Sequence, residues 1–182
     1  MIRIDDGDLV LRSPTLDDAP IIFAAVDADR ARLRRWLPWV ELTKTPDDTR
    51  AFVERSLAGL EAGSAMDLVL LHDGAFAGLA SLVDISSVNR RAMIGYWISS
   101  GREGRGLVTR AVQRLLAYGF DTLGLERIGL YAATDNTRSR AVAERCGLTL
   151  EGVLRHHEFV DDRYVDHAVY AILAEEWRDA RG

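Results

Sequence analysis

Hydrophobic residues in the first part of the chain follow two different spacings. Residues 9–12 (Leu-Val-Leu-Arg) predict a short strand, which the following Ser-Pro-Thr sequence ends. Helical spacing follows from Thr15 to Ala25, and the hydroxyl and carboxylates at its start are typical of a helix N-terminus. Residues 30–39 predict a further helix that continues until Pro38 interrupts it.

Thr45 marks the strongest helix start in the sequence. It combines a capping hydroxyl, a proline at the first helical position and two carboxylates that face the positive end of the helix dipole. Apolar residues then repeat at helical spacing from Phe52 to Leu60, and the helix is expected to end near Gly63. One face of this helix should therefore pack inward.

The middle of the chain predicts a β-meander. Residues 67–72 and 76–84 flank Asp73-Gly74, a dipeptide typical of a two-residue hairpin turn. Residues 89–98 predict a further strand, in which Tyr96 and the residues two positions away share one face.

The second half alternates helices with strands. A polar, glycine-rich loop at residues 99–106 opens into an amphipathic helix, and a later short helix is capped by Asp135-Asn136. The expected helices and strands after the loop are residues 107–116, 127–133, 137–145, 148–158 and 164–173. Since the chain has no internal repeat, low-complexity tract or linker, this order predicts one domain over residues 1–182, with helices and strands around a central sheet.

Composition narrows the class of protein. The chain has 182 residues, 48% hydrophobic and 28% charged, as is typical of one globular domain. It contains neither a signal-peptide pattern nor the apolar run of roughly 18–20 residues that a membrane span needs, so no membrane partner is expected. Its one cysteine, Cys146, excludes an internal disulfide and a multi-cysteine metal site, and indicates a cytoplasmic location. The net charge of −5 disfavours direct binding of nucleic acid but is compatible with a local basic pocket for a phosphorylated ligand.

The loop that precedes residue 107 is the most informative candidate for chemistry. Gly104 and Gly106 allow the backbone to approach a ligand closely, and the helix that follows offers unpaired N–H groups and a positive dipole end. A pyrophosphate suits this geometry, and Arg102 and Arg105 could add positive charge. A plain strand-to-helix connection remains the alternative, while the spacing fits neither a Walker loop nor a dinucleotide-binding fingerprint.

Three blocks of sequence resemble the GNAT acetyltransferases. Residues 94–98 (Ile-Gly-Tyr-Trp-Ile) with 103–109 (Glu-Gly-Arg-Gly-Leu-Val-Thr) resemble the cofactor-binding core of that family, and residues 135–148 resemble its next block. Residues 150–155, with the Tyr-Val-Asp-His sequence at 164–167, resemble the closing block of the RimJ/RimL-like branch, which acetylates N-termini of ribosomal proteins.

The first block departs from the family pattern at two positions. Glu103 stands where glutamine or arginine is usual, and Val108 where glycine or alanine is usual. The contact made by residue 103 is therefore an open question.

The resemblance implies an α+β fold with a central, mostly antiparallel, twisted sheet flanked by helices. It also implies acetyl-coenzyme A as co-substrate, no metal, and a homodimer. Backbone amides of the loop would cradle the pyrophosphate, the strand edge before it would bind the pantetheine arm, and Asn136 would contact pantetheine as well as cap its helix. The residues implied in cofactor binding are Tyr96, Trp97, Ile98, Gly104, Arg105, Gly106, Leu107, Val108, Thr109 and Asn136.

The resemblance also implies two catalytic residues. Acetyl transfer needs a neutral amine, a stabilised oxyanion and a proton for the departing thiolate. Glu158 matches the position of the proposed general base in RimL-like enzymes, and Ser139 the position of the proposed thiolate partner. The alternatives are a solvent-facing carboxylate at a strand end and an ordinary polar residue in a short helix.

The acceptor site is expected to be lined by Trp36 and Trp39, with His156 as a secondary base. Core packing is the alternative for both tryptophans. A zinc site formed by His157, Asp161 and His167 is a further alternative, although no known ligand spacing supports it. Neighbouring histidines such as 156 and 157 should point to opposite faces of a strand.

The sequence therefore predicts an enzyme that moves an acetyl group from acetyl-coenzyme A to an amine by direct attack in a ternary complex. The expected acceptor is the N-terminal amino group of a protein or peptide, such as a ribosomal protein. The alternatives are a small-amine or antibiotic acetyltransferase, a succinyltransferase on the same fold, and a non-catalytic coenzyme A sensor.

Overall fold

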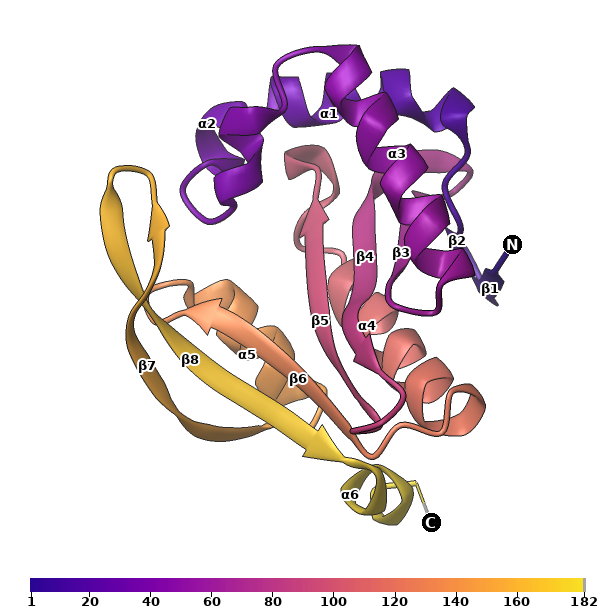
Figure 1. Cartoon of the computed structure of the whole chain (residues 1–182), viewed down its shortest axis with the longest axis vertical. Coiled ribbons are helices and arrows are strands. Elements are labelled where there is room, and N and C mark those ends of the chain that lie inside the picture. The colour runs from indigo at the N-terminus through magenta and orange to yellow at the C-terminus, as the bar shows by residue number, and fades with distance from the viewer. Residues whose placement is uncertain (182) are drawn as a thin grey trace.

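A computed structural model describes residues 1–181, and its strands join one sheet (Figure 1). The strand order is β1-β2-β3-β4-β5-β6-β8-β7, and each neighbouring pair is antiparallel except β5 with β6. The predicted α+β class with a mostly antiparallel sheet is confirmed. The strands are β1 (Arg3–Asp6), β2 (Leu9–Arg12), β3 (Met66–His72), β4 (Ala75–Ser86), β5 (Arg91–Ile98), β6 (Arg127–Ala133), β7 (Thr149–Val160) and β8 (Arg163–Leu173).

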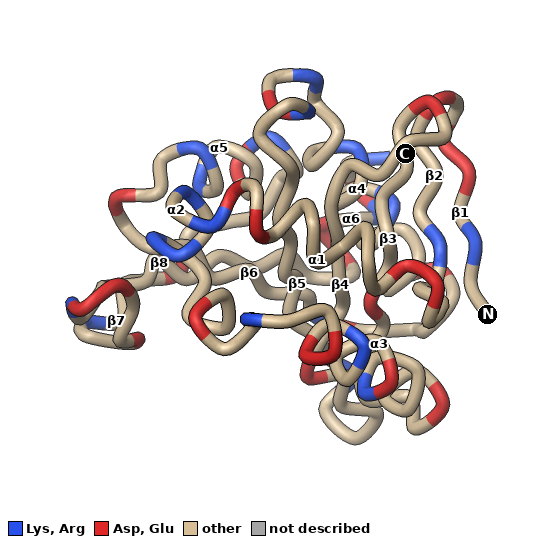
Figure 2. Tube along the Cα trace, turned by 90° about the horizontal axis from the view of Figure 1, so that it is seen from above, with Lys and Arg blue, Asp and Glu red and all other residues tan. Residues whose placement is uncertain are grey.

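Helices cover both faces of the sheet (Figure 1). They are α1 (Ala19–Ala28), α2 (Arg30–Leu33), α3 (Pro46–Glu61), α4 (Leu107–Ala117), α5 (Thr137–Arg145) and α6 (Ala174–Asp179). Viewed from above, acidic and basic positions are scattered among longer uncharged stretches of the chain (Figure 2). None of the helices in the described part of the chain is both long and apolar enough to cross a membrane.

The parallel pair β5 and β6 separates partway along its length. Pairing runs from Arg91 opposite Arg127 to Ile94 opposite Leu130 and then stops. Residues 95–98 of β5 and 131–133 of β6 are not paired with each other, and the two strands diverge in Figure 1. We call these unpaired ends the β5–β6 fork, because they leave backbone groups in the middle of the sheet without a neighbouring strand.

Strand β5 is held between two hydrophobic cores. Ile94 and Tyr96 pack in the core on the α4 and α5 side of the sheet. Trp97 points to the other face and packs with Leu79, Trp39 and residues of α1 and α3. Since side chains alternate along a strand, this arrangement follows directly from the sequence 94–98 and fixes the strand on both faces.

The turns and the helix cap that the sequence predicted are present in the structure. Asp73 and Gly74 have φ of 51° and 76°, and Asp161 and Asp162 have φ of 51° and 59°, the left-handed values of a primed hairpin turn. Thr45 caps α3: its hydroxyl accepts the N–H of Asp48 at 3.3 Å, and the Asp48 carboxylate accepts the Thr45 N–H at 2.8 Å.

The helix predicted over residues 30–39 was wrong in extent. Helix α2 ends at Leu33, and a 3₁₀ helix begins only at Pro38. The residue before a proline is driven out of the helical region, and Leu37 accordingly has φ −129° and ψ 100°.

Two elements were missed altogether. Strand β1 is short and mostly charged, and α6 follows β8 with no breaker residue between them. The start of α6 is set by the Glu176 carboxylate, which accepts the N–H of Leu173 at 2.8 Å.

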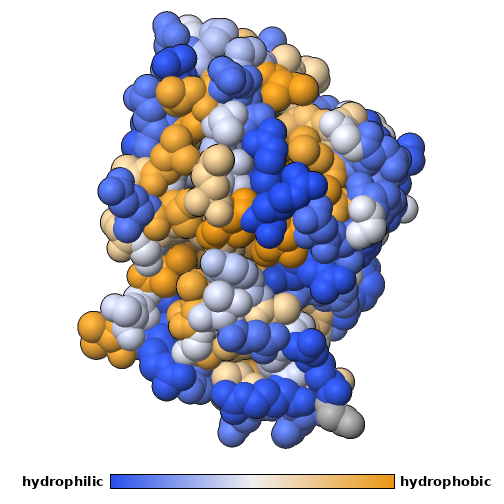
Figure 3. Space-filling model, turned by 90° about the vertical axis from the view of Figure 1, so that its right-hand side faces the viewer, coloured by the Kyte–Doolittle hydropathy of each residue, from blue (hydrophilic) through white to orange (hydrophobic). Residues whose placement is uncertain are grey.

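The two edges of the sheet differ in character. Edge strand β1 is four residues long and carries an ion pair between Arg3 and Asp5 at 2.7 Å. Figure 3 shows this side of the molecule, where hydrophilic residues cover much of the surface. Edge strand β7 is twelve residues long, and nearly all its residues are exposed. Short charged edges resist pairing with another chain, whereas a long exposed edge offers more backbone groups for such pairing.

Gly78 provides a test of how tightly β4 and β5 pack. A Cβ at this position would lie against the Trp97 carbonyl oxygen and 2.8 Å from the Ile98 Cα, both backbone atoms. We expect Gly78→Ala to lower the free energy of unfolding in urea by about 1–3 kcal/mol, as overpacking does. Gly95→Ala is the control, because nothing lies within 4 Å of its Cβ. Equal stability of the two variants would contradict this close approach.

Candidate active site

The glycine-rich loop exposes its backbone at the start of α4. Gly104 and Gly106 have φ of 73° and 72°, and no atom lies within 4 Å of a Cβ built on either. Gly106 is the N-cap, and its carbonyl accepts the first helical hydrogen bond, from the N–H of Arg110 at 3.1 Å. The N–H groups of Leu107, Val108 and Thr109 therefore have no acceptor within the helix. Such a terminus suits a diphosphate.

The three residues of β5 predicted to bind cofactor differ in the direction of their backbone N–H and C=O groups. Ser99 donates its N–H to Ala77 in β4 at 2.8 Å. Because hydrogen-bonding direction alternates along a strand, the polar backbone groups of Ile98 and Tyr96 point into the fork instead. Trp97 directs its backbone to β4, and its side chain is buried in the second core.

Glu103 connects the two sides of the fork. Its carboxylate accepts Arg32 of the α2 segment at 2.8 Å and Arg138 of α5 at 2.7 Å. Arg32 also binds Asp29 at 2.8 Å and donates to the Ile98 carbonyl at 2.6 Å. The departure from the family pattern at residue 103 thus has a physical role, since a carboxylate can hold two guanidinium groups where glutamine or arginine could not.

Two hydroxyls meet on the α5 side of the fork. Ser139 Oγ and Tyr96 Oη lie 2.8 Å apart, and the Ser139 N–H donates to the Asn136 side chain at 3.1 Å. Asn136 is therefore a helix cap, as predicted, and this contact fixes where Ser139 lies. Burial raises the pKa of Tyr96 to about 12, so its hydroxyl keeps its proton at neutral pH.

Glu158 lies on a bulged part of β7. Residues 155–157 of β7 stand opposite Asp166 alone, between the pairs Leu154–His167 and Glu158–Val165. Glu158 Oε2 lies 3.5 Å from His167 Nε2. Burial raises the pKa of Glu158, although the nearby His157 acts in the opposite direction, so this carboxylate is a stronger base than an exposed one.

His157 and His156 contact different neighbours, in agreement with the predicted opposite faces. The His157 ring centroid lies 5.0 Å from that of His167 and 5.4 Å from that of Tyr131. Successive residues 157 and 158 both contact His167, because the bulge breaks the alternation of the strand.

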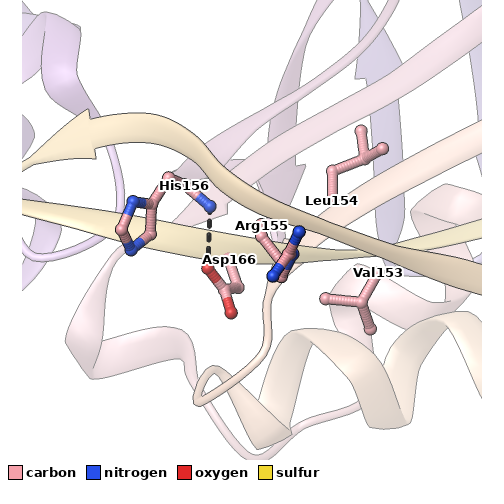
Figure 4. A pocket seen from close by; sticks show the side chains of 5 residues that line it. All are labelled: Val153, Leu154, Arg155, His156 and Asp166. Atoms are coloured by element: carbon pink, nitrogen blue, oxygen red, sulfur yellow. Dashed lines mark hydrogen bonds between the residues drawn. The ribbon is translucent and has the colours of Figure 1, made fainter.

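His156 lies in a separate place. Its φ is 49°, its N–H donates to Asp166 at 2.8 Å, and its ring stacks on Tyr164 at 5.4 Å. Figure 4 shows the hydrogen bond beside a hollow of about 580 Å³. The hollow is lined by Val153, Leu154, Arg155, His156 and Asp166.

The two tryptophans play different parts. Trp36 packs against Ala133, Val160 and Val165, on the strands that carry the Glu158 cluster. Trp39 lies 6.3 Å from Trp97 between ring centroids and packs, partly buried, against the second core. The contacts of Trp39 are therefore with the second core, whereas Trp36 packs against the strands that carry Glu158 and His167.

The structure gives no support to the zinc alternative. Asp161 is paired with Arg34 at 2.9 Å. Within residues 1–181, the one group of three with its ligand atoms close together is Asp8, His72 and Asp73, and arginines already contact Asp8 and His72 there.

The sequence did not indicate the contacts of Arg32, Tyr131 and His167. Each of these side chains contacts a residue distant in sequence, so no local spacing could predict the contact.

Comparisons with known proteins agree with this geometry. The family described as "Acetyltransferase (GNAT) domain" matches residues 8–149. The putative ribosomal N-acetyltransferase YdaF of Bacillus subtilis (strain 168) is 36% identical over 167 residues, 88% of each chain.

Two solved structures are similar over nearly the whole chain. One is RimL, a ribosomal L7/L12 alpha-N-protein acetyltransferase in complex with coenzyme A, with a TM-score of 0.91 and 27% identity over 94% of this chain and 98% of that one. The other is the microcin C7 self-immunity acetyltransferase MccE in complex with acetyl-CoA and AMP, with a TM-score of 0.88 and 28% identity over 92% and 93%.

Gly106→Ala tests whether the loop backbone contacts coenzyme A. The added Cβ would enter open space beside the unpaired N–H groups and strain a left-handed residue. We expect the dissociation constant for coenzyme A, measured by calorimetry, to rise about tenfold or more, which corresponds to about 1.4 kcal/mol.

Gly124→Ala is the matched control. Gly124 also has a positive φ, 64°, with open space around its Cβ, but it lies in the loop before β6. A similar loss of affinity in both variants would show that general destabilisation, not the loop, is responsible.

Proposed function

Because the chain belongs to the GNAT acetyltransferase family, we propose that it transfers the acetyl group of acetyl-coenzyme A to the N-terminal amino group of a protein or peptide. One observation carries this proposal. The β5–β6 fork separates a diphosphate-type site at the start of α4 from a cluster that contains a basic carboxylate, so donor and acceptor can meet between them.

The residues of the loop and fork fit coenzyme A. The N–H groups of residues 107–109 would hold the diphosphate, with space left open by Gly104 and Gly106. The backbone of Tyr96 and Ile98 would bind the pantetheine amides as a neighbouring strand does. Arg32 contacts the Ile98 carbonyl, so its side chain must share or yield that acceptor when the arm binds.

Acetyl-coenzyme A supplies the thioester whose carbonyl carbon the amine attacks. Glu158 takes a proton from the acceptor ammonium, which leaves a neutral nucleophile. A backbone N–H of the fork stabilises the oxyanion as the C–N bond forms. The C–S bond then breaks, and Ser139, hydrogen-bonded to Tyr96, gives a proton to the departing sulfur. The attacking nitrogen must lose its second proton to become an amide, and that proton returns to the Ser139 oxygen.

The acceptor is proposed from YdaF, named as a putative ribosomal N-acetyltransferase, and from RimL, named as a ribosomal L7/L12 alpha-N-protein acetyltransferase. MccE, crystallised with acetyl-CoA and AMP, favours a second candidate, a small-molecule amine, on the same fold. A fold alone does not determine the acceptor, since groove lining sets it. We also propose a cytoplasmic location, in keeping with the buried, unpaired Cys146.

Thiol release with a panel of acceptors tests this proposal. We expect acetyl-coenzyme A to yield free thiol in the presence of peptides with a free N-terminus, but not with the same peptides blocked at the N-terminus. Faster turnover with polyamines or aminoacyl nucleotides would favour the small-amine function. Succinyl-coenzyme A as the better donor would identify a succinyltransferase, and cofactor binding without release from any acceptor would identify a sensor.

Glu158→Gln tests the base. Removing the carboxylate should lower turnover by about 10²–10⁴-fold, the range of general base catalysis, while affinity for coenzyme A stays unchanged. Glu175→Gln, in α6, is the control and should keep wild-type turnover. Near-normal turnover of Glu158→Gln at saturating peptide would remove Glu158 from the mechanism.

We also propose that two copies pair through β7. Among its side chains, Leu150, Val153 and Phe159 are 46%, 51% and 55% exposed, and no strand within residues 1–181 pairs with its outer side. Exposed apolar side chains on a long free edge favour an isologous contact.

Val153→Lys tests the dimer, because an edge lysine opposes strand pairing. Sedimentation should give a mass near twice 20.2 kDa for the wild type and near 20.2 kDa for the variant. Val88→Lys, at a side chain 90% exposed outside β7, should remain dimeric. A wild-type monomer would contradict the dimer without affecting the proposed activity.

A further inference from the structure

His167 lies at the centre of the cluster that contains Glu158, His157 and Tyr131. It is on β8, between Ala133 of β6 and Leu154 of β7. Its side chain is only 12% exposed, and its Nε2 atom faces Glu158 Oε2 at 3.5 Å. This distance is at the outer limit of a hydrogen bond, and such catalytic contacts often shorten when substrate binds.

The two ring nitrogens of His167 have different surroundings. Nδ1 is buried and has no hydrogen-bond partner among residues 1–181, whereas Nε2 faces a carboxylate. A buried N–H without an acceptor is costly, so the favoured neutral tautomer carries its proton on Nε2 and directs it at Glu158. Burial, and secondarily the nearby His157, lower the pKa of His167, which keeps the ring neutral near pH 7.

We propose that His167 is a positioning residue that donates its Nε2–H to Oε2 of Glu158, so that Oε1 stays free to take the proton of the acceptor amine. This inference rests on the proposed acetyl transfer. The proton passes from the ammonium nitrogen to Oε1, while His167 neither gains nor loses one. The hydrogen bond stabilises the ionised carboxylate, holds its plane, and offsets part of the cost of burying it.

Other charged or titratable groups near Glu158 and His167 could also contribute to a pH profile. His157 on β7 and Tyr131 on β6 contact the His167 ring at 5.0 and 6.4 Å between centroids. On the segment after α2, Arg34 is paired with Asp161, and Arg35 lies 5.4 Å from the Trp36 ring centroid. None of these groups is itself substituted in a variant at residue 167, so comparing two variants at that position isolates the donor that they differ in.

His167→Leu and His167→Gln separate positioning from packing. Leucine removes the N–H donor, whereas glutamine keeps one. For leucine we expect kcat to fall about tenfold and the acid limb of kcat/KM to move up by about one pH unit, because the carboxylate loses a stabilising donor. Glutamine should restore most of both. Arg178→Gln, at an exposed residue of α6, should behave as wild type.

The outcomes are distinct. An unshifted acid limb in His167→Leu, or equal losses in the leucine and glutamine variants, would show that His167 only packs. If the leucine variant does not fold, nitrogen NMR of the wild-type imidazole decides: a proton on Nε2 supports the proposal, and a proton on Nδ1 overturns it. If the wild type releases no thiol with any amine, the proposed acetyl transfer itself is contradicted.

Discussion

The active site depends on the point where β5 and β6 stop pairing. Parallel strands need not separate, but here pairing ends after Ile94 and Leu130, while each strand keeps its other neighbour. Unpaired backbone groups inside a sheet are costly unless something binds them. Two cores pack against β5 from both faces and β8 pairs with β6, so each side of the fork is held in place, as the proposed binding of an extended polar chain requires.

Charged contacts hold the elements around this fork in place. Glu103 binds Arg32 from one side and Arg138 from the other, and Arg34 reaches Asp161 at the tip of the β7–β8 hairpin. These pairs are partly exposed, and surface pairs contribute little each to stability. Their role is geometric, because they fix the relative positions of the N-terminal helices, the glycine-rich loop and the β7–β8 hairpin. The proposed site is formed by these separate segments.

Local elements could be predicted from the sequence because their signals are local. The cap at Thr45, the turn at Asp73-Gly74 and the glycines before α4 act within a few residues, and the structure places each as expected. The early end of α2 at Leu33 was not predicted, because the pattern of residues 30–39 shows no break before Pro38.

The site itself was only half predictable. Its loop lies in one continuous segment, but the contact between Glu158 and His167 needs both the pairing of β7 with β8 and a bulge at residues 155–157. Glu103 likewise has partners 71 and 35 positions away in sequence. A pattern of alternating residues cannot reveal a bulge, so the neighbours of the base could be found only in three dimensions.

Backbone hydrogen exchange with and without coenzyme A tests the central claim, that the fork and the start of α4 together form one cofactor site. The account predicts slower exchange at the N–H groups of residues 107–109 and of Tyr96 and Ile98 when coenzyme A is added, with little change in β1 and β2. Protection confined to other elements, with the fork exchanging at its unbound rate, would contradict it.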